Sequence, residues 1–234
     1  MRHRSGLPGI VGGALLLLLT TPPPAFGQTE GTGVTCIPVS ERAGREFGCF
    51  ILATQEIGRL DSGHVFWHIS TSADGAAPAA PDGPRGTVVE SLGKSWVFTI
   101  ADAGWRPSHG TPVAAIGPLP ITPGVSYTAQ YMEAVLRPGM KSLVHRHSGP
   151  EAWYTLTGET CLETPAGTRV GRAGGVNVIV PSGPPMELTA TGTEVRRALV
   201  LVLHDCTRPA TSPAADWSPK GLCKVSRLER EGVQ

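Results

Sequence analysis

The chain has 234 residues, of which 40% are hydrophobic and 17% are charged. This length allows one large domain or two small ones around a buried core. The 20 lysines and arginines nearly balance the 19 aspartates and glutamates, and no basic block is present. This charge balance excludes a nucleic-acid-binding protein, which would carry a basic patch. Thirty glycines and 22 prolines indicate many turns, as is typical of an all-β protein.

The first 27 residues have the pattern of a secretory signal peptide. Arg2 and Arg4 precede an apolar stretch at residues 7–19, and small residues lead up to Gly27, where we expect cleavage. The stretch is shorter than the roughly 20 residues that span a bilayer. We therefore expect a secreted or periplasmic protein that has no membrane association after cleavage.

Residues 28–118 are predicted to form a β-rich N-terminal region. Its short runs of valine, isoleucine, threonine and aromatic residues, bounded by glycine or proline, are typical of strands. An insert rich in alanine, proline and glycine at residues 73–85 is predicted to be an irregular loop. The region is either a diverged copy of the β unit that follows or an extension of it.

Residues 119–206 carry a denser and more regular strand pattern. Short β-type runs alternate with glycine and proline turns, which predicts a closed sandwich or barrel. The predicted strands lie at residues 127–136, 143–147, 152–157, 160–163, 169–171, 177–180, 187–190 and 195–204. Residues 207–234 are predicted to be a C-terminal tail, solvated and poorly ordered beyond Cys223.

All five cysteines follow the predicted cleavage site and therefore enter a compartment in which disulfides persist. Cys36 is predicted to pair with Cys49, and Cys206 with Cys223. Each pair encloses a short segment, and closing such a loop stabilises a fold by about 3 kcal/mol. Cys161 is then left as a small buried apolar residue in a strand.

The strongest chemical signal lies in residues 138–154. Side chains two residues apart in a strand point to the same face, so His145 and His147 project together. A Gly-Pro turn follows, and an antiparallel return can bring Glu151 beside the two imidazoles. Two histidines and a carboxylate are the ligands of non-haem iron oxygenases, and they also suit Mn, Cu, Ni or Zn. The sequence thus predicts a site for a divalent metal ion without fixing which metal it holds.

The spacing of these residues matches the first motif of a known superfamily. That motif reads Gly, five residues, His-x-His, three or four residues, Glu, six residues, Gly. All its fixed positions are filled here, by Gly139, His145, His147, Glu151 and Gly158. The chain therefore resembles the cupin superfamily. The resemblance implies a double-stranded β-helix, or jelly-roll barrel, with the metal on the three ligands. It also leads us to expect a homodimer. The N-terminal region is then expected to be either a degenerate cupin half or an extension of the barrel.

The second cupin motif is incomplete. Gly175 and the turn at residues 181–183 are present, but Met186 stands at the histidine position and Ala190 at the asparagine position. In cupins that histidine completes the metal shell, so at most three protein ligands remain. A thioether is a soft, weak ligand that suits copper but does little for Mn, Fe or Zn. We expect Met186 to pack inside the barrel instead.

Further side chains are expected to line the barrel interior. Because neighbours in a strand alternate between faces, one of Trp153 and Tyr154 should form an aromatic wall. The same alternation lets only one of Gln130 and Glu133 face inward. The residues predicted to line the pocket are Gln130, Tyr154, Met186 and His204.

Two functions are compatible with these features. The first is a secreted, metal-dependent enzyme that acts on a small molecule, with dioxygenase-like oxidoreductase chemistry named first and isomerase or lyase chemistry second. Fold alone does not choose among them. The second is a non-catalytic cupin that binds a sugar or another small molecule without a functional metal, which the methionine at position 186 favours.

Overall fold

The computed structural model describes residues 33–72, 81 and 83–226, and the predicted signal peptide lies outside them. Strands dominate the described residues, whose one helical element is the short 3-10 turn η1 (Val39–Glu41). The all-β prediction is confirmed. No helix within the described ranges is long and apolar enough to cross a membrane.

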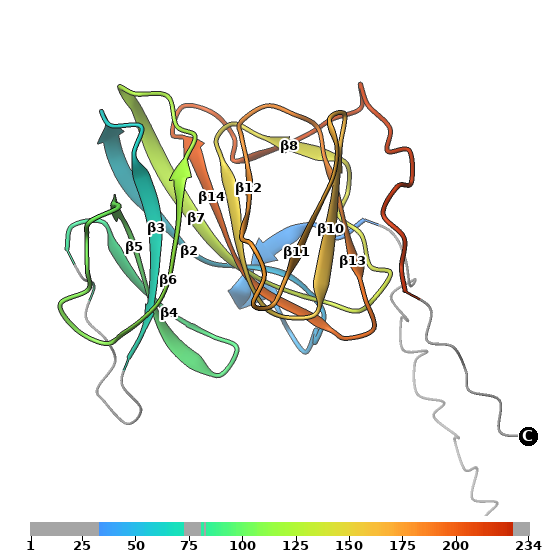
Figure 1. Ribbon diagram of the computed structural model, residues 1–234, viewed down its shortest axis with the longest axis horizontal. Coiled ribbons are helices and arrows are strands. Elements are labelled where there is room, and N and C mark those ends of the chain that lie inside the picture. Colours follow the sequence, from blue (N-terminus) through green and yellow to red (C-terminus); the bar gives the residue numbers. More distant parts are fainter. Residues whose placement is uncertain (1–32, 73–80, 82, 227–234) are drawn as a thin grey trace, which may run out of the picture.

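A six-stranded sheet forms the middle of the molecule (Figure 1). Its strands, in spatial order, are β1 (Cys36–Pro38), β2 (Gly48–Leu60), β7 (Val125–Leu136), β14 (Arg196–Asp205), β9 (Glu151–Thr157) and β12 (Val178–Val180). The central strand β14 contains the run Leu199–Leu203, which is apolar at every position. Such a run is typical of a strand that is buried on both faces.

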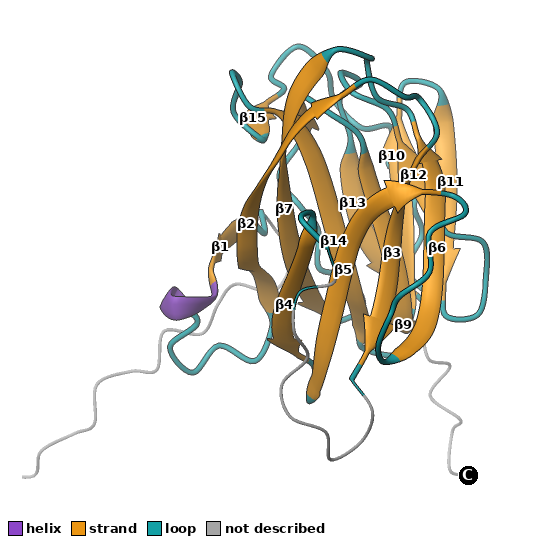
Figure 2. Ribbon diagram, turned by 90° about the vertical axis from the view of Figure 1, so that its left-hand side faces the viewer, coloured by secondary structure: helices purple, strands orange, loops and turns teal. Residues whose placement is uncertain are grey.

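Smaller sheets cover this large sheet on both sides. On one side lie β10 (Glu159–Thr164), β11 (Gly167–Arg172) and β13 (Glu187–Thr191), and at their edge β8 (His145–His147) pairs with β15 (Thr211–Pro213). On the other side lie β3 (Val65–Thr71), β4 (Gly86–Ser91), β5 (Lys94–Asp102) and β6 (Thr111–Leu119), seen in front of the large sheet in Figure 2. Strand pairing among the described residues does not join these sheets into one closed ring. The barrel is therefore an open double sheet.

Alternating side chains of the large sheet fill two separate cores. The barrel core lies between the large sheet and β10, β11 and β13; its members include Trp153, Leu162, Met186, Val200 and Val202. The flank core lies between the large sheet and β3 to β6; its members include Trp67, Phe98, Tyr131, Leu199 and Leu201. Even-numbered residues of β14 thus face the barrel core and odd-numbered residues face the flank core.

The strands of residues 28–118 contribute to both layers. β2 pairs with β7 along its length, from Gly48 opposite Val135 to Leu60 opposite Val125. β3 to β6 form the sheet that covers the flank core. The same stretch of sequence therefore supplies two strands, β1 and β2, to the large sheet and the whole of its outer cover.

Backbone conformation and close packing explain why two positions of the first motif are glycines. Gly139 and Gly158 have φ angles of 92° and 69°, in the left-handed region that side chains rarely adopt. A Cβ atom at Gly158 would also lie 2.7 Å from the Cα of Arg196. A glycine is therefore required where β9 turns into β10.

The disulfides differ in part from the prediction. Cys36 is bonded to Cys49 as predicted. The predicted Cys206–Cys223 pair is wrong, because Cys223 is bonded to Cys161, 62 residues earlier, and Cys206 is an exposed free thiol. The short separation favoured the wrong pair, but the chain between these two cysteines runs away from Cys206 along the barrel.

Residues 207–226 follow the barrel surface. β15 pairs with β8, and the backbone N–H groups of Lys220 and Leu222 donate to the two carboxylate oxygens of Glu163 on β10. Glu163 is 1% exposed. These contacts and the Cys161 disulfide hold the C-terminal segment against the same strand.

Candidate metal centre

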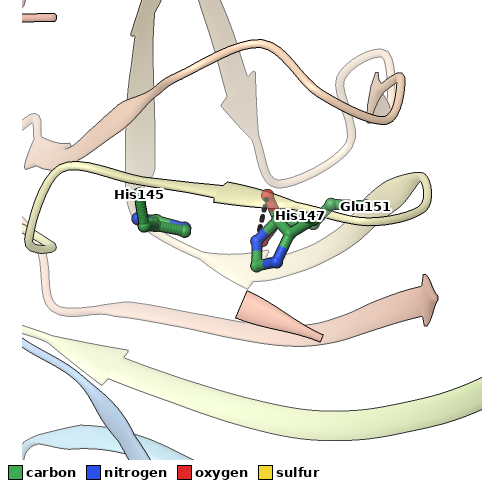
Figure 3. Close-up of side chains that lie close together, drawn as sticks. All are labelled: His145, His147 and Glu151. Carbon is green, nitrogen blue, oxygen red and sulfur yellow. Dashed lines mark ion pairs between the residues drawn. The ribbon is translucent and has the colours of Figure 1, made fainter. Parts of the chain in front are cut away.

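The three predicted metal ligands meet at one end of the barrel. His145 and His147 begin and end β8, and Glu151 begins β9 after the intervening turn. One potential ligand atom from each residue lies within 4.8 Å of the others. Figure 3 shows the two imidazoles on one side of β8 with the carboxylate beside His147. The period-two alternation that motivated the prediction therefore holds in the fold.

Both imidazoles are held in one tautomer. The Nδ1 atom of His145 lies 2.7 Å from the carbonyl oxygen of Leu143, and Nδ1 of His147 lies 2.8 Å from that of Ala210. A carbonyl oxygen can only accept, so each Nδ1 carries the proton and donates it. The Nε2 atoms are left with free lone pairs, which is the arrangement of metal-binding histidines.

Two acceptor atoms face each other inside this site. His147 Nε2 and Glu151 Oε2 are buried, have no hydrogen-bond partner, and lie 3.6 Å apart. That separation is too long for a hydrogen bond. Two ligands bound about 2.1 Å from a tetrahedral ion would lie about 3.4 Å apart. The spacing therefore fits a shared cation.

Burial sets the charge state of the central histidine. His147 is 5% exposed. Its burial lowers the pKa of the imidazole; the carboxylate of Glu151 opposes this shift, and the neighbouring His145 and His204 add to it. A lowered pKa favours the neutral imidazole, which is the form that binds a metal ion.

The predicted pocket-lining residues fall into different places. Gln130 pairs with Val202 of the barrel core and shares its face, and Met186 is fully buried in that core. His204 lies at the end of β14, where its Nδ1 is 2.9 Å from the carbonyl oxygen of Asp205. It is close enough to His147 to contribute to the lowered pKa of that residue.

Tyr154 is the incorrect member of the predicted pocket. It packs against the flank core, while its neighbour Trp153 lies in the barrel core. The register explains the difference, because Trp153 pairs with Val200 and Tyr154 pairs with Leu199. A signal for this was present in the sequence: Trp153 lies two residues after Glu151 and therefore shares its face.

Sequence reasoning missed one feature of the site and one of the barrel around it. The first is the contribution of the C-terminal segment, since Ala210 and Thr211 both contact Nδ1 of His147, the latter through Oγ1 at 3.1 Å. The second is Arg196, which is fully buried at the start of β14. Arg196 pairs with Leu136 and lies on the same face of β14 as Val200. Its burial could not be predicted without the sheets that cover both faces of this strand.

Known proteins of similar structure exist for part of the chain. No protein-family model matches it, and no curated protein matches it. A cupin-like protein from Thermotoga maritima is 16% identical, with 37% of this chain and 64% of that chain covered and a TM-score of 0.33. A Cupin 2 conserved barrel domain protein from Salinispora arenicola is 24% identical, with 34% and 65% covered and a TM-score of 0.30. Each match thus spans less than two thirds of these two proteins.

A third solved structure is described by its double-stranded β-helix domain. It is an uncharacterized conserved protein with a double-stranded β-helix domain from Klebsiella pneumoniae, 19% identical, with 47% of this chain and 84% of that chain covered and a TM-score of 0.33. The spacing of Gly139, His145, His147, Glu151 and Gly158 is that of the first cupin motif. None of these three descriptions names an activity.

Proposed function

We propose that this cupin-like protein binds a divalent metal ion through His145, His147 and Glu151 and acts on a small organic molecule in its barrel. The observation that carries the proposal is the pair of buried acceptors, His147 Nε2 and Glu151 Oε2, that face each other without a donor. Unpartnered buried acceptors cost free energy, and a cation between them removes that cost.

The donor set limits the metal and its chemistry. Two imidazole nitrogens and one carboxylate oxygen suit Fe, Mn, Cu, Ni or Zn. Such an ion, when bound, supplies a Lewis acid with open coordination positions. The protein holds both imidazoles in the ligating tautomer through Leu143 and Ala210, and it keeps His147 and Glu151 away from bulk water. We propose dioxygenase-like oxidation as the reaction class, with isomerase or lyase chemistry as the next.

A second function is favoured by one observation. Met186 replaces the fourth ligand of the cupin motif and is fully buried in the barrel core. This substitution suits a barrel that binds a sugar or another small molecule without metal. Three protein ligands and an open position are, however, the usual composition of a catalytic metal site. The retained triad therefore places the metal-dependent function first.

We also propose that the protein works outside the cytoplasm. The Cys36–Cys49 and Cys161–Cys223 disulfides support this, because such bonds persist in oxidising compartments. The signal-peptide pattern of residues 1–27 is the sequence feature that agrees with it.

The test is the metal content of the mature protein, purified from its exporting compartment without chelator or histidine tag. Elemental mass spectrometry should find close to one equivalent of a divalent metal in the wild type and none in His147→Ala, which should still unfold cooperatively. Tyr154→Phe is the matched control, since Tyr154 packs on the flank core, and it should keep the metal. Equal metal content in wild type and His147→Ala would overturn the assignment. A wild type that stays metal-free after reconstitution would favour the binding protein.

A further inference from the structure

The barrel core contains a buried positive charge that the metal centre does not use. Arg196 is 0% exposed. β14 pairs with β7 without a register shift, so Arg196 shares the face of Val200, a barrel-core residue. Its guanidinium carbon lies 5.5 Å from the ring centroid of Trp153, also in the barrel core. The charged end of the side chain therefore lies inside the barrel.

This charge lies over the Trp153 ring, but two of its nitrogens make no hydrogen bond. Nε and Nη2 of Arg196 are buried and have no hydrogen-bond partner among the described residues. Burial lowers the pKa of Arg196 to about 10, and the carboxylate of Glu151 opposes that shift. The guanidinium is therefore still protonated at neutral pH. A buried cation that makes no ion pair in contact with it is strongly unfavourable, so the barrel interior is electrostatically incomplete.

The geometry of the free atoms indicates what would complete it. Nε and Nη2 lie on one edge of the planar guanidinium and present two parallel N–H donors, which match the two oxygens of a carboxylate. Two further barrel groups are buried without partners, Trp153 Nε1 and Thr160 Oγ1. Thr160 lies two residues before Leu162 of the barrel core and shares its face. The interior thus offers a positive charge and several free donors.

We propose that Arg196 binds the carboxylate of a small organic anion inside the barrel. The inference deepens the proposed function and rests on it for the role of the anion, which would be the substrate of the neighbouring metal centre. Glu151 is the charged group that influences both Arg196 and His147, so it connects the two sites electrostatically. One guanidinium balances one carboxylate, whereas a phosphate dianion would leave a net negative charge in a dry interior.

Calorimetric titration of the chelated, metal-free protein tests the anion site separately from the metal. Acetate and its neutral analogue acetamide are the probes, at constant ionic strength. We expect acetate to bind the wild type and acetamide not to bind. Arg196→Gln should lower acetate affinity about 10- to 100-fold, the range for loss of charge-assisted hydrogen bonds. Arg197→Gln removes the same charge from the opposite face of β14 and should leave acetate binding unchanged. Equal acetate affinity in the two variants, equal binding of acetamide, or a preference for inorganic phosphate over acetate would overturn the proposal.

Two more readouts separate this inference from the proposed function and from a structural role. Arg196→Gln should keep the wild-type metal content. A wild type that binds metal but no acetate would overturn the inference and leave the metal centre standing. A wild type that binds acetate but takes up no metal on reconstitution would overturn the metal centre and leave the anion site standing. Arg196→Met should raise the melting temperature, because it removes an unpaired buried charge. A lower melting temperature with unchanged acetate binding would assign Arg196 to the fold alone.

Discussion

The two faces of the large sheet bury carboxylates in different ways. Glu133 points to the flank side and is 1% exposed; it accepts hydrogen bonds from Arg42 and from Ser91 Oγ, the latter at 2.5 Å. Glu151 points to the barrel side and is 5% exposed, but its Oε2 has no partner. A buried carboxylate that serves the fold is satisfied by the fold. The unsatisfied one indicates a site that a ligand completes.

The remaining buried glutamates follow the pattern of Glu133. Both oxygens of Glu163 accept backbone N–H groups, and Glu187 pairs with Lys141 at 2.9 Å. Among the described residues, Glu151 is the one buried glutamate that has a buried oxygen without a partner. The contrast between Glu133 and Glu151 therefore separates architecture from function on the same sheet.

The largest expected effect comes from neutralising each carboxylate in turn. Glu151→Gln should lower zinc affinity by about 100-fold or more, because it removes a charged ligand. Glu133→Gln should leave zinc affinity unchanged and lower the free energy of unfolding by about 2 kcal/mol, because it breaks a buried hydrogen-bonded pair. Zinc titration and urea unfolding measure the two effects. Loss of zinc affinity in Glu133→Gln as large as in Glu151→Gln would remove the distinction.

The next effect distinguishes the two disulfides. Replacing Cys161 and Cys223 by serine should lower zinc affinity about tenfold, because this bond anchors the segment that brings Ala210 to Nδ1 of His147. Its loss should also lower the free energy of unfolding by about 4 kcal/mol.

The matched control removes the other disulfide. Replacing Cys36 and Cys49 by serine should cost about 3 kcal/mol of stability and leave zinc affinity as it is. That bond joins β1 to β2, away from the metal ligands. Equal zinc affinity in the two double variants would show that the C-terminal segment does not position His147.

A smaller effect appears in the pH dependence of the chelated protein. Burial lowers the pKa of His147, on the barrel side, and of His68, on the flank side. The unfolded chain takes up these protons near pH 6.5 and the folded protein does so at lower pH. Stability should therefore be full above pH 6.5 and fall as the pH drops toward the lowered values.

Single variants divide this acid sensitivity between the two regions. The free energy of unfolding, measured in urea, should fall less between pH 7 and pH 5.5 in His147→Gln and in His68→Gln than in the wild type. Added zinc should protect wild type and His68→Gln at the lower pH but not His147→Gln, because zinc competes with the proton on His147 and does not bind His68. An unchanged slope in His147→Gln would be inconsistent with a buried neutral imidazole.

The smallest expected change is a gain in zinc affinity. Met186 and His145 exchange backbone hydrogen bonds of 3.1 and 2.8 Å, so their side chains lie on the same face. Met186→His would add an imidazole beside the triad, and we expect zinc affinity to rise about tenfold. Zinc titration in the presence of a competing chelator measures it. No gain would show that the side chain at position 186 lies out of reach of the metal position.

Local rules predicted much of the site. Strand alternation placed His145 and His147 together, and the motif spacing located the turns at Gly139 and Gly158, whose backbone only glycine adopts easily. The same rule, applied from Glu151, would have selected Trp153 in place of Tyr154 as the barrel residue. The two-residue period is a property of each strand, so these features depend on short stretches of sequence.

Long-range contacts produced the features that the sequence did not reveal. The path of residues 207–226 depends on Glu163 and Cys161, both far away in sequence, so neither the correct disulfide nor the role of Ala210 follows from spacing. Arg196 begins β14 ahead of its apolar run, where an arginine is usually a surface residue. Its burial follows from the sheets that cover β14 on both faces.

Anomalous diffraction from zinc-loaded crystals, recorded above and below the zinc absorption edge, tests the central claim most directly. The account predicts one strong peak within about 2.0–2.2 Å of His145 Nε2, His147 Nε2 and a carboxylate oxygen of Glu151. The peak should be missing in crystals of Glu151→Gln and present in crystals of Glu133→Gln. A zinc peak away from these atoms, or its persistence in Glu151→Gln, would contradict the assignment of the barrel face as the metal site.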